Sequence, residues 1–215
     1  MTDVRLAPQA RTLLIMVPGM GIKAADFDAE GITGAAKHRW PVTTAYVDPG
    51  PNSYLDGSTE ARLLDGIAQA RDAAKTDRVW LAGISLGCQA ILRCVRARPD
   101  LASGLILLTP YLASTGLVAQ VAHAGGLRRW ASTARQDDQE SVLLTWLANT
   151  PLAALPRIFL GHALADRFAM TATMLADLLP AEQVVTVAGR HDWASWRALW
   201  DKILDKNPPW AIATS

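Results

Sequence analysis

The chain has 215 residues, of which 50% are hydrophobic and 19% charged, and its formal net charge is +1. This length suits one α/β domain with a substantial core, and the composition excludes a disordered chain. The near-neutral charge gives no reason to expect nucleic acid or an anionic membrane as a partner.

Short apolar runs alternate with stretches of helical spacing. The predicted strands are 12–17, 42–47, 79–82, 104–109, 157–161 and 183–188. The predicted helices of the regular pattern are 24–37, 59–74, 88–97, 168–179 and 193–204. Continuous apolar runs with β-branched members are typical of strands covered on both faces. We therefore predict an α/β fold in which helices flank a mainly parallel sheet.

The regular alternation stops between Tyr111 and Pro156. No strand is evident there, and the helical stretches are 117–123, 126–134 and 139–148. Such a connection is long for a simple crossover. We predict a helical insertion at about 111–156 that acts as a small cap over a pocket. No repeat or second domain is evident, so 1–215 is predicted to be a single domain.

The N-terminal segment and the cysteines bear on localisation. Residues 1–10 lack the basic start and apolar run of a secretory signal, and no apolar stretch reaches transmembrane length. We expect a soluble, cytoplasmic protein. Cys88 and Cys94 fall on one predicted helix, poorly placed for a disulfide, so we expect buried thiols. No Cys/His cluster has metal-ligand spacing, so no metal site is predicted.

The segment Gly83-Ile84-Ser85-Leu86-Gly87 joins the strand 79–82 to the helix 88–97. A G-x-S-x-G pattern between strand and helix is the sequence pattern of a nucleophile elbow. The flanking glycines leave room for the sharp turn on which the serine sits. The pattern alone is weak, and its alternative is a merely structural turn. Its context makes Ser85 the predicted nucleophile.

A serine hydroxyl needs a base within hydrogen-bond reach, and the chain has four histidines. His191 follows the last predicted strand, at the sheet edge where open α/β folds place their crevice, and is the predicted base. Its alternative is a histidine in a surface turn. His162 is a candidate for a supporting role and His123 for lining the pocket, whereas His38 is expected to be solvated.

The base needs a carboxylate to hold its tautomer. Asp166, in the loop after the strand 157–161, is the predicted acid, and its alternative role is to cap the next helix. Asp192 competes with it, but adjacent residues point apart, so we expect Asp192 to cap the last helix. The acidic residues of the insertion are expected to form a solvated face; they are Asp137, Asp138 and Glu140.

Acyl transfer also needs donors for the oxyanion. We predict the backbone N–H of Leu86, which follows the nucleophile, and that of Met20, with Gly21 as the alternative. The loop that holds Met20 is Pro18-Gly19-Met20-Gly21. An ordinary strand-to-helix turn would have the same sequence.

With these pieces placed, the chain resembles the α/β-hydrolase superfamily from Leu13 to Leu204. The resemblance rests on Pro18-Gly19-Met20-Gly21, Gly83-Ile84-Ser85-Leu86-Gly87, Asp166 and Gly189-Arg190-His191-Asp192-Trp193. The order Ser, Asp, His is that expected for this fold. The resemblance implies a small serine esterase without metal or organic cofactor. Two departures are Pro18-Gly19 where many members have His-Gly, and a short chain, which implies missing or reduced antiparallel strands at the start.

We therefore predict a serine hydrolase that cleaves small-molecule carboxylic esters through an acyl-enzyme. One alternative is a thioesterase or acyltransferase with the same triad, and another is a non-catalytic α/β-hydrolase-like binding module. Tyr111 and Trp193 are candidate substrate contacts. Tyr111 equally suits the core of the insertion, and Trp193 lies at helical spacing with Trp196 and Trp200, a pattern more typical of core. Nothing in the sequence indicates an oligomeric state.

Overall fold

The computed structural model describes residues 2–7, 10–76 and 78–206, and these residues contain one seven-stranded sheet. Its order is β1-β3-β2-β4-β5-β6-β7. The strands are β1 Thr2–Arg5, β2 Thr12–Val17, β3 Val42–Val47, β4 Arg78–Ile84, β5 Gly104–Leu108, β6 Arg157–Ala163 and β7 Val184–Val187. Only the β1–β3 pair is antiparallel among these strands. The predicted mainly parallel sheet is confirmed.

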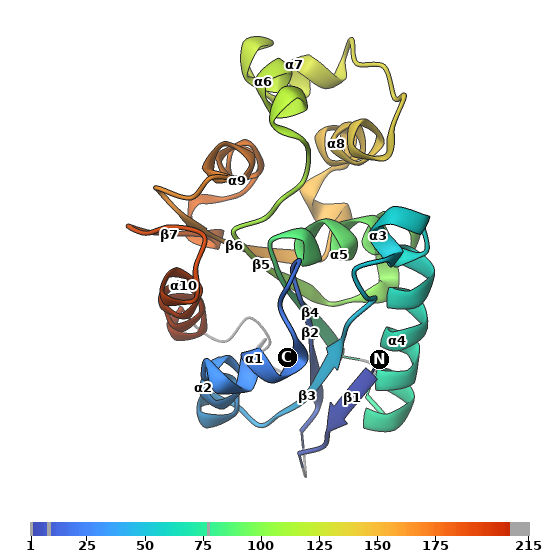
Figure 1. Ribbon diagram of the computed structural model, residues 1–215, viewed down its shortest axis with the longest axis vertical. Helices are drawn as coiled ribbons and strands as arrows, with labels where there is room; N and C mark the ends of the chain where they lie inside the picture. Colours follow the sequence, from blue (N-terminus) through green and yellow to red (C-terminus); the bar gives the residue numbers. More distant parts are fainter. Residues whose placement is uncertain (1, 8–9, 77, 207–215) are drawn as a thin grey trace.

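Helices cover both faces of the sheet (Figure 1). One face packs against α1 Ala24–Ala29, α2 Ile32–Arg39 and α10 Trp193–Asp205. The other packs against α4 Thr59–Ala74, α5 Leu86–Ala97 and α9 Ala169–Ala176. Shorter helical elements are α3 Ser53–Asp56 and the 3₁₀ turns Pro99–Leu101, Leu152–Ala154 and Ala181–Gln183. Each face thus has its own buried apolar cluster, as expected for strands covered on both sides.

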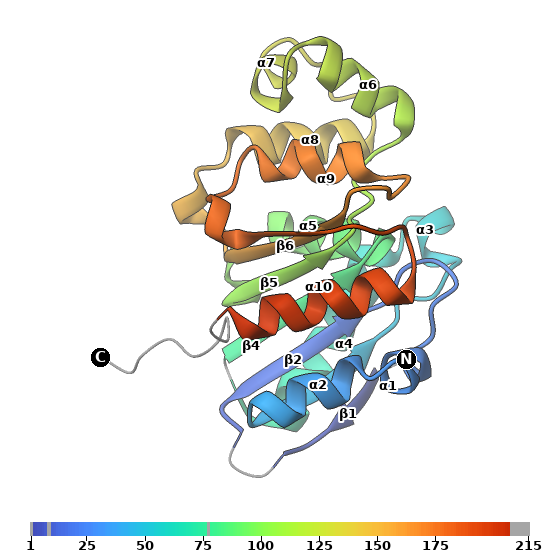
Figure 2. The ribbon, with the colours of Figure 1, turned by 90° about the vertical axis from the view of Figure 1, so that its left-hand side faces the viewer.

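The connection between β5 and β6 contains the predicted helices, which are α6 Thr115–His123, α7 Leu127–Ala131 and α8 Gln139–Asn149. In Figure 2, α6 and α7 lie beyond α8 and α9, away from the sheet. Leu143 and Leu144 of α8 are fully buried in the cluster that also contains α5, so α8 anchors the insertion to the body.

The structure corrects one expectation about the N-terminal part and bears on a second. The predicted single helix 24–37 is wrong, because the chain breaks between α1 and α2 at Gly31, whose φ of 76° no α-helix accommodates. The segment before the first predicted strand contains β1, which pairs antiparallel with β3. The described residues therefore have one antiparallel strand at the start, in agreement with the expectation that these strands are missing or reduced.

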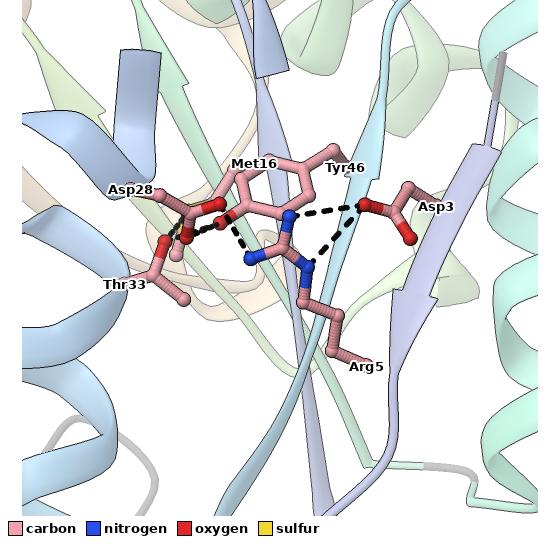
Figure 3. Close-up of polar contacts among 6 residues, drawn as sticks. All are labelled: Asp3, Arg5, Met16, Asp28, Thr33 and Tyr46. Carbon is pink, nitrogen blue, oxygen red and sulfur yellow. Dashed lines mark hydrogen bonds and ion pairs between the residues drawn. The ribbon is translucent and has the colours of Figure 1, made fainter. Parts of the chain in front are cut away.

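A polar cluster joins β1 to α1, α2 and β3 (Figure 3). The Tyr46 hydroxyl donates to Asp28 Oδ1 at 2.7 Å and shares a hydrogen bond with the Thr33 hydroxyl. The Arg5 guanidinium donates to the same carboxylate and lies 5.0 Å from the centre of the Tyr46 ring. Burial raises the pKa of Tyr46 to about 12. Burial also opposes ionisation of Asp28, but the donors around it outweigh that effect and lower its pKa.

In this cluster, substitution of Asp28 and of Asp3 should lower the free energy of unfolding by different amounts. Asp28→Ala lowers the free energy of unfolding by about 1–3 kcal/mol, because the buried Tyr46 hydroxyl loses its carboxylate acceptor. Asp3→Ala, which removes only an exposed ion pair with Arg5, lowers it by at most about 0.5 kcal/mol. Urea denaturation followed by tryptophan fluorescence measures both. Equal losses in the two variants would contradict this account.

Cys88 and Cys94 are buried and free, as the sequence predicts. Burial raises the pKa of Cys94 to about 12 and that of Cys88 above its usual range, so neither thiol is a thiolate nucleophile at neutral pH. A helix with the length and apolar character needed to cross a bilayer is not found within residues 2–7, 10–76 and 78–206.

Candidate active site

The predicted site residues follow the carboxyl ends of different strands. Met20 follows β2, Ser85 follows β4, Asp166 follows β6 and His191 follows β7. The register pairs Val17 of β2 with Gly83, Ile84 of β4 with Leu108, Leu108 with Gly161, and Ala163 of β6 with Val187 of β7. Because these strands are parallel, their carboxyl ends form one edge of the sheet, which is where open α/β sheets bind ligands.

Ser85 occupies a strained turn between β4 and α5. Its φ of 54° and ψ of −118° lie in a region that residues other than glycine rarely adopt. A Cβ on Gly83 would lie 2.8 Å from the Cys88 backbone nitrogen, and one on Gly87 would lie 2.4 Å from the Val17 carbonyl oxygen. Both glycines are therefore required by close backbone packing, and the elbow geometry expected from the sequence is present.

The loop after β2 packs directly against this elbow. A Cβ on Gly19 would lie 2.8 Å from the Ile84 carbonyl oxygen and 3.0 Å from Ser85 Cβ. Leu86 is the first residue of α5, where the helix dipole favours a negative charge. Among the described residues, the N–H groups of Met20 and Leu86 have no backbone acceptor. Both are available as donors beside Ser85.

Asp166 and His191 form a close pair. Asp166 Oδ2 lies 2.7 Å from His191 Nδ1, and Asp166 Oδ1 accepts a hydrogen bond from the Phe168 N–H at 2.7 Å. The Asp166 side chain is 0% exposed and that of His191 is 11% exposed. Asp192 instead accepts from the Ser195 N–H at 2.9 Å and caps α10, as predicted. Asp166 is not the N-cap of α9, which is Phe168, but its Oδ1 accepts from the Phe168 N–H just before that helix.

Two aromatic side chains hold the His191 ring. Phe168 and Trp196 each meet it edge to face, with ring centroids 5.0 Å and 5.2 Å away. Trp196 Nε1 donates to Thr109 Oγ1 at 2.8 Å, and the Thr109 N–H donates to the Gly161 carbonyl at 2.7 Å. Sequence reasoning missed Phe168 and Thr109 as parts of the site. The closeness of Phe168 to Asp166 in the chain is the one signal that pointed to it.

Ser85 opens into a cavity of about 240 Å³. Its lining consists of Met20, Ser85, Leu86, Tyr111, Arg167 and Phe168. Tyr111 thus lines the same cavity as Ser85, whereas Trp193 is outside the lining and packs against Trp196 and Phe27. Ser85 Oγ forms no hydrogen bond with His191 or with any other residue in the described part of the chain.

Glu140 departs from the expected solvated acidic face. Its Oε1 accepts from the Tyr111 hydroxyl at 2.9 Å and its Oε2 from the Ser114 N–H at 2.7 Å. Asp138 accepts from the Ser141 N–H at 2.8 Å and caps α8. The insertion is therefore tied to the cavity lining through Glu140 and Tyr111. Within the described part of the chain, no cluster of three or more His, Cys, Asp or Glu is arranged to hold a metal ion.

The remaining histidines occupy different environments. His38 and His123 are exposed, so His38 is solvated as predicted and His123 is outside the lining. His162 on β6 is buried, and its Nδ1 has no hydrogen-bond partner among the described residues. Burial lowers the pKa of His162, and the nearby Asp166 charge opposes that effect only in part.

The burial of His162 predicts that the folded chain becomes less stable in acid. Below about pH 6.5 the unfolded chain protonates His162 while the folded chain does not, so stability falls as the pH falls towards the lowered folded pKa. In His162→Leu, the free energy of unfolding should decline less between about pH 6.5 and pH 5. Denaturant titrations across this range measure it, with His38→Leu as the surface control. Identical pH dependence in His162→Leu and the native chain would contradict the prediction.

Comparison with known proteins identifies the fold. Neither a family model nor a curated sequence matches the chain. Solved structures do match it: an α/β-hydrolase from a lagoon-sediment metagenome has 14% identity and a TM-score of 0.64, over 95% of this chain and 92% of that one. The Staphylococcus aureus S-formylglutathione hydrolase has 15% identity and a TM-score of 0.63, over 93% and 82%. A monoacylglycerol lipase from Paleococcus ferrophilus has 16% identity and a TM-score of 0.58, over 96% and 99%.

Proposed function

We propose that this chain, which has the α/β-hydrolase fold, is a serine hydrolase that cleaves small carboxylic esters. The observation that carries the proposal is the convergence of a strained Ser85 elbow and a buried Asp166–His191 hydrogen bond of 2.7 Å on one sheet edge. A binding module would need neither the strained serine nor the buried carboxylate beneath a histidine. Strain at a single polar residue is typical of functional sites.

In the proposed mechanism, Ser85 Oγ attacks the acyl carbon while His191 Nε2 takes the hydroxyl proton. Asp166 holds Nδ1–H, which keeps Nε2 free to accept, and stabilises the imidazolium that forms. The N–H groups of Met20 and Leu86 bind the oxyanion. His191 then returns the proton to the leaving alcohol. Water, activated by the same histidine, releases the acid from Ser85, and no metal or organic cofactor takes part.

The acyl-enzyme provides the test of this proposal. Rapid mixing with p-nitrophenyl acetate should give a burst of p-nitrophenolate, and quenched samples should carry an acetyl group on the peptide that contains Ser85. Turnover without acylation of Ser85 would exclude the mechanism. Absence of turnover with every ester and thioester tried would favour the non-catalytic binding module.

The same residues suit a thioesterase or an acyltransferase. Oxygen and thiol esters of one acyl group, compared by kcat/KM, separate the first alternative from an esterase. Adding a primary alcohol or amine as acceptor separates the second, because an acyltransferase would form the transfer product in preference to the acid. Faster hydrolysis of the oxygen ester without preferential transfer is the result that the esterase proposal expects.

A further inference from the structure

One charged side chain lines the cavity of Ser85. Of its lining residues, Met20, Leu86 and Phe168 are apolar, and Ser85 and Tyr111 are neutral. Arg167 is the exception, and it immediately follows the proposed catalytic acid in the chain. The Arg167 cation therefore lines the cavity in which Ser85 is proposed to attack the ester bond.

The backbone around Arg167 is fixed by the proposed acid itself. Asp166 Oδ1 accepts from the Phe168 N–H at 2.7 Å, and the Asp166 carbonyl accepts from the Ala169 N–H at 3.0 Å. The guanidinium lies 4.9 Å from the centre of the Phe168 ring, whose edge contact holds His191. Such stacking orients the planar cation and leaves its N–H groups free for another partner. The exposed Arg167 side chain therefore stacks on Phe168 at the cavity that Ser85 lines.

The Arg167 guanidinium has no hydrogen bond or ion pair within the described part of the chain. Some arginines do, since Arg93 pairs with Glu60 at 2.7 Å and Arg197 pairs with Glu30, but these lie outside the cavity lining. The carboxylate attached to this lining belongs to Glu140, and both of its oxygens already accept hydrogen bonds from neutral donors. A stacked arginine without a carboxylate partner, facing a cavity, has the donor geometry that carboxylates and phosphates bind.

The other charges near the site lie outside this lining. Lys23 and Asp48 line a separate cavity, which Met20 also borders. Arg190 and Asp192 flank His191 in the chain, and Asp192 is engaged as the cap of α10. Arg167 is thus the group that a charged substrate would meet beside Ser85.

We infer that Arg167 binds an anionic group of the substrate, so that the preferred esters or thioesters carry a carboxylate or a phosphate near the scissile bond. This inference rests on the proposed function. Arg167 selects the substrate, while Ser85, His191 and Asp166 carry out the reaction. Its effect therefore falls on the ratio of kcat/KM values between charged and neutral substrates.

Matched substrate pairs test the inference and locate the anion. On the acyl side, p-nitrophenyl hemisuccinate is compared with p-nitrophenyl pentanoate. On the leaving-group side, 4-acetoxybenzoate and 4-acetoxyphenyl phosphate are each compared with 4-acetoxybenzamide. The native chain should prefer the anion by about tenfold in kcat/KM in at least one pair, and added salt should reduce that preference. The intrinsic reactivities cancel because each ratio is compared between native chain and variant.

Arg167→Gln should remove about tenfold of the charged-to-neutral ratio, and Arg167→Lys should restore part of it. Arg190→Gln, which removes an exposed cation outside the lining, is the matched control and should leave the ratio unchanged. An unchanged ratio in Arg167→Gln for every pair overturns the inference, as does an equal loss in Arg190→Gln. If hydrolysis depends on Ser85 but Arg167→Gln leaves the charged-to-neutral ratio unchanged, only this inference is refuted. If no hydrolysis depends on Ser85, the proposed function is refuted as well.

Discussion

Ser85→Ala is expected to lower kcat for ester hydrolysis by about 10⁵- to 10⁶-fold, the largest loss predicted for any single substitution in this chain. The reason is that no other described nucleophile is placed to act at this elbow. Cys88 and Cys94 are buried with raised pKa values. What remains without the Ser85 hydroxyl is binding and oxyanion stabilisation by backbone N–H groups.

The loss in Ser85→Ala has to be separated from unfolding. Alanine at a φ of 54° carries much the same backbone strain as serine, so the variant should keep the native circular dichroism spectrum and melting temperature. Ser114→Ala is the matched control, because Ser114 is exposed and its hydroxyl makes no capping hydrogen bond. Steady-state rates with p-nitrophenyl acetate measure both variants. More than about 1% of native activity in folded Ser85→Ala would place the nucleophile elsewhere.

Asp166→Asn is expected to lower kcat by about 10⁴-fold. The Asp166 carboxylate uses one oxygen for the Phe168 N–H and the other for His191 Nδ1. Asparagine has a single side-chain oxygen. If that oxygen keeps the Phe168 N–H, the NH₂ group faces Nδ1, and the proton of the neutral imidazole moves to Nε2. His191 then presents a donor to Ser85 instead of a base.

Asp192→Asn is the control for this substitution. Asp192 accepts from the Ser195 N–H, and asparagine is an equally good capping residue, so kcat should change by no more than about twofold. Both variants replace a carboxylate with an amide, one at the partner of His191 Nδ1 and the other at the residue that follows His191. A large loss in Asp192→Asn together with a small loss in Asp166→Asn would reverse the assignment of the acid.

Much of the fold was predictable because its signals are local. The strands were visible as continuous apolar runs, and the Ser85 elbow follows from steric rules that act within a few residues. The break at Gly31 was missed, because a glycine within a helical pattern is often tolerated and only its φ of 76° ends the helix. β1 was missed because a short, partly exposed edge strand has no apolar run to reveal it.

The candidate site could be predicted only for residues whose type and position after a predicted strand both match a known catalytic role. The contact between Asp166 and His191 could be anticipated, because each residue follows a predicted strand at the same edge of the sheet. Thr109 could not be found, because its link to Trp196 joins segments that are far apart in the sequence. The role inferred for Arg167 likewise depends on a cavity and on stacking over Phe168, and both exist only once the chain is folded.

Labelling with a fluorophosphonate tests the central claim most directly, because the reagent reacts with a serine that a neighbouring base has activated. The native chain should be labelled on the peptide that contains Ser85, while folded Ser85→Ala and His191→Ala should remain unlabelled. Failure of the folded native chain to label, or labelling that survives Ser85→Ala, would contradict the account.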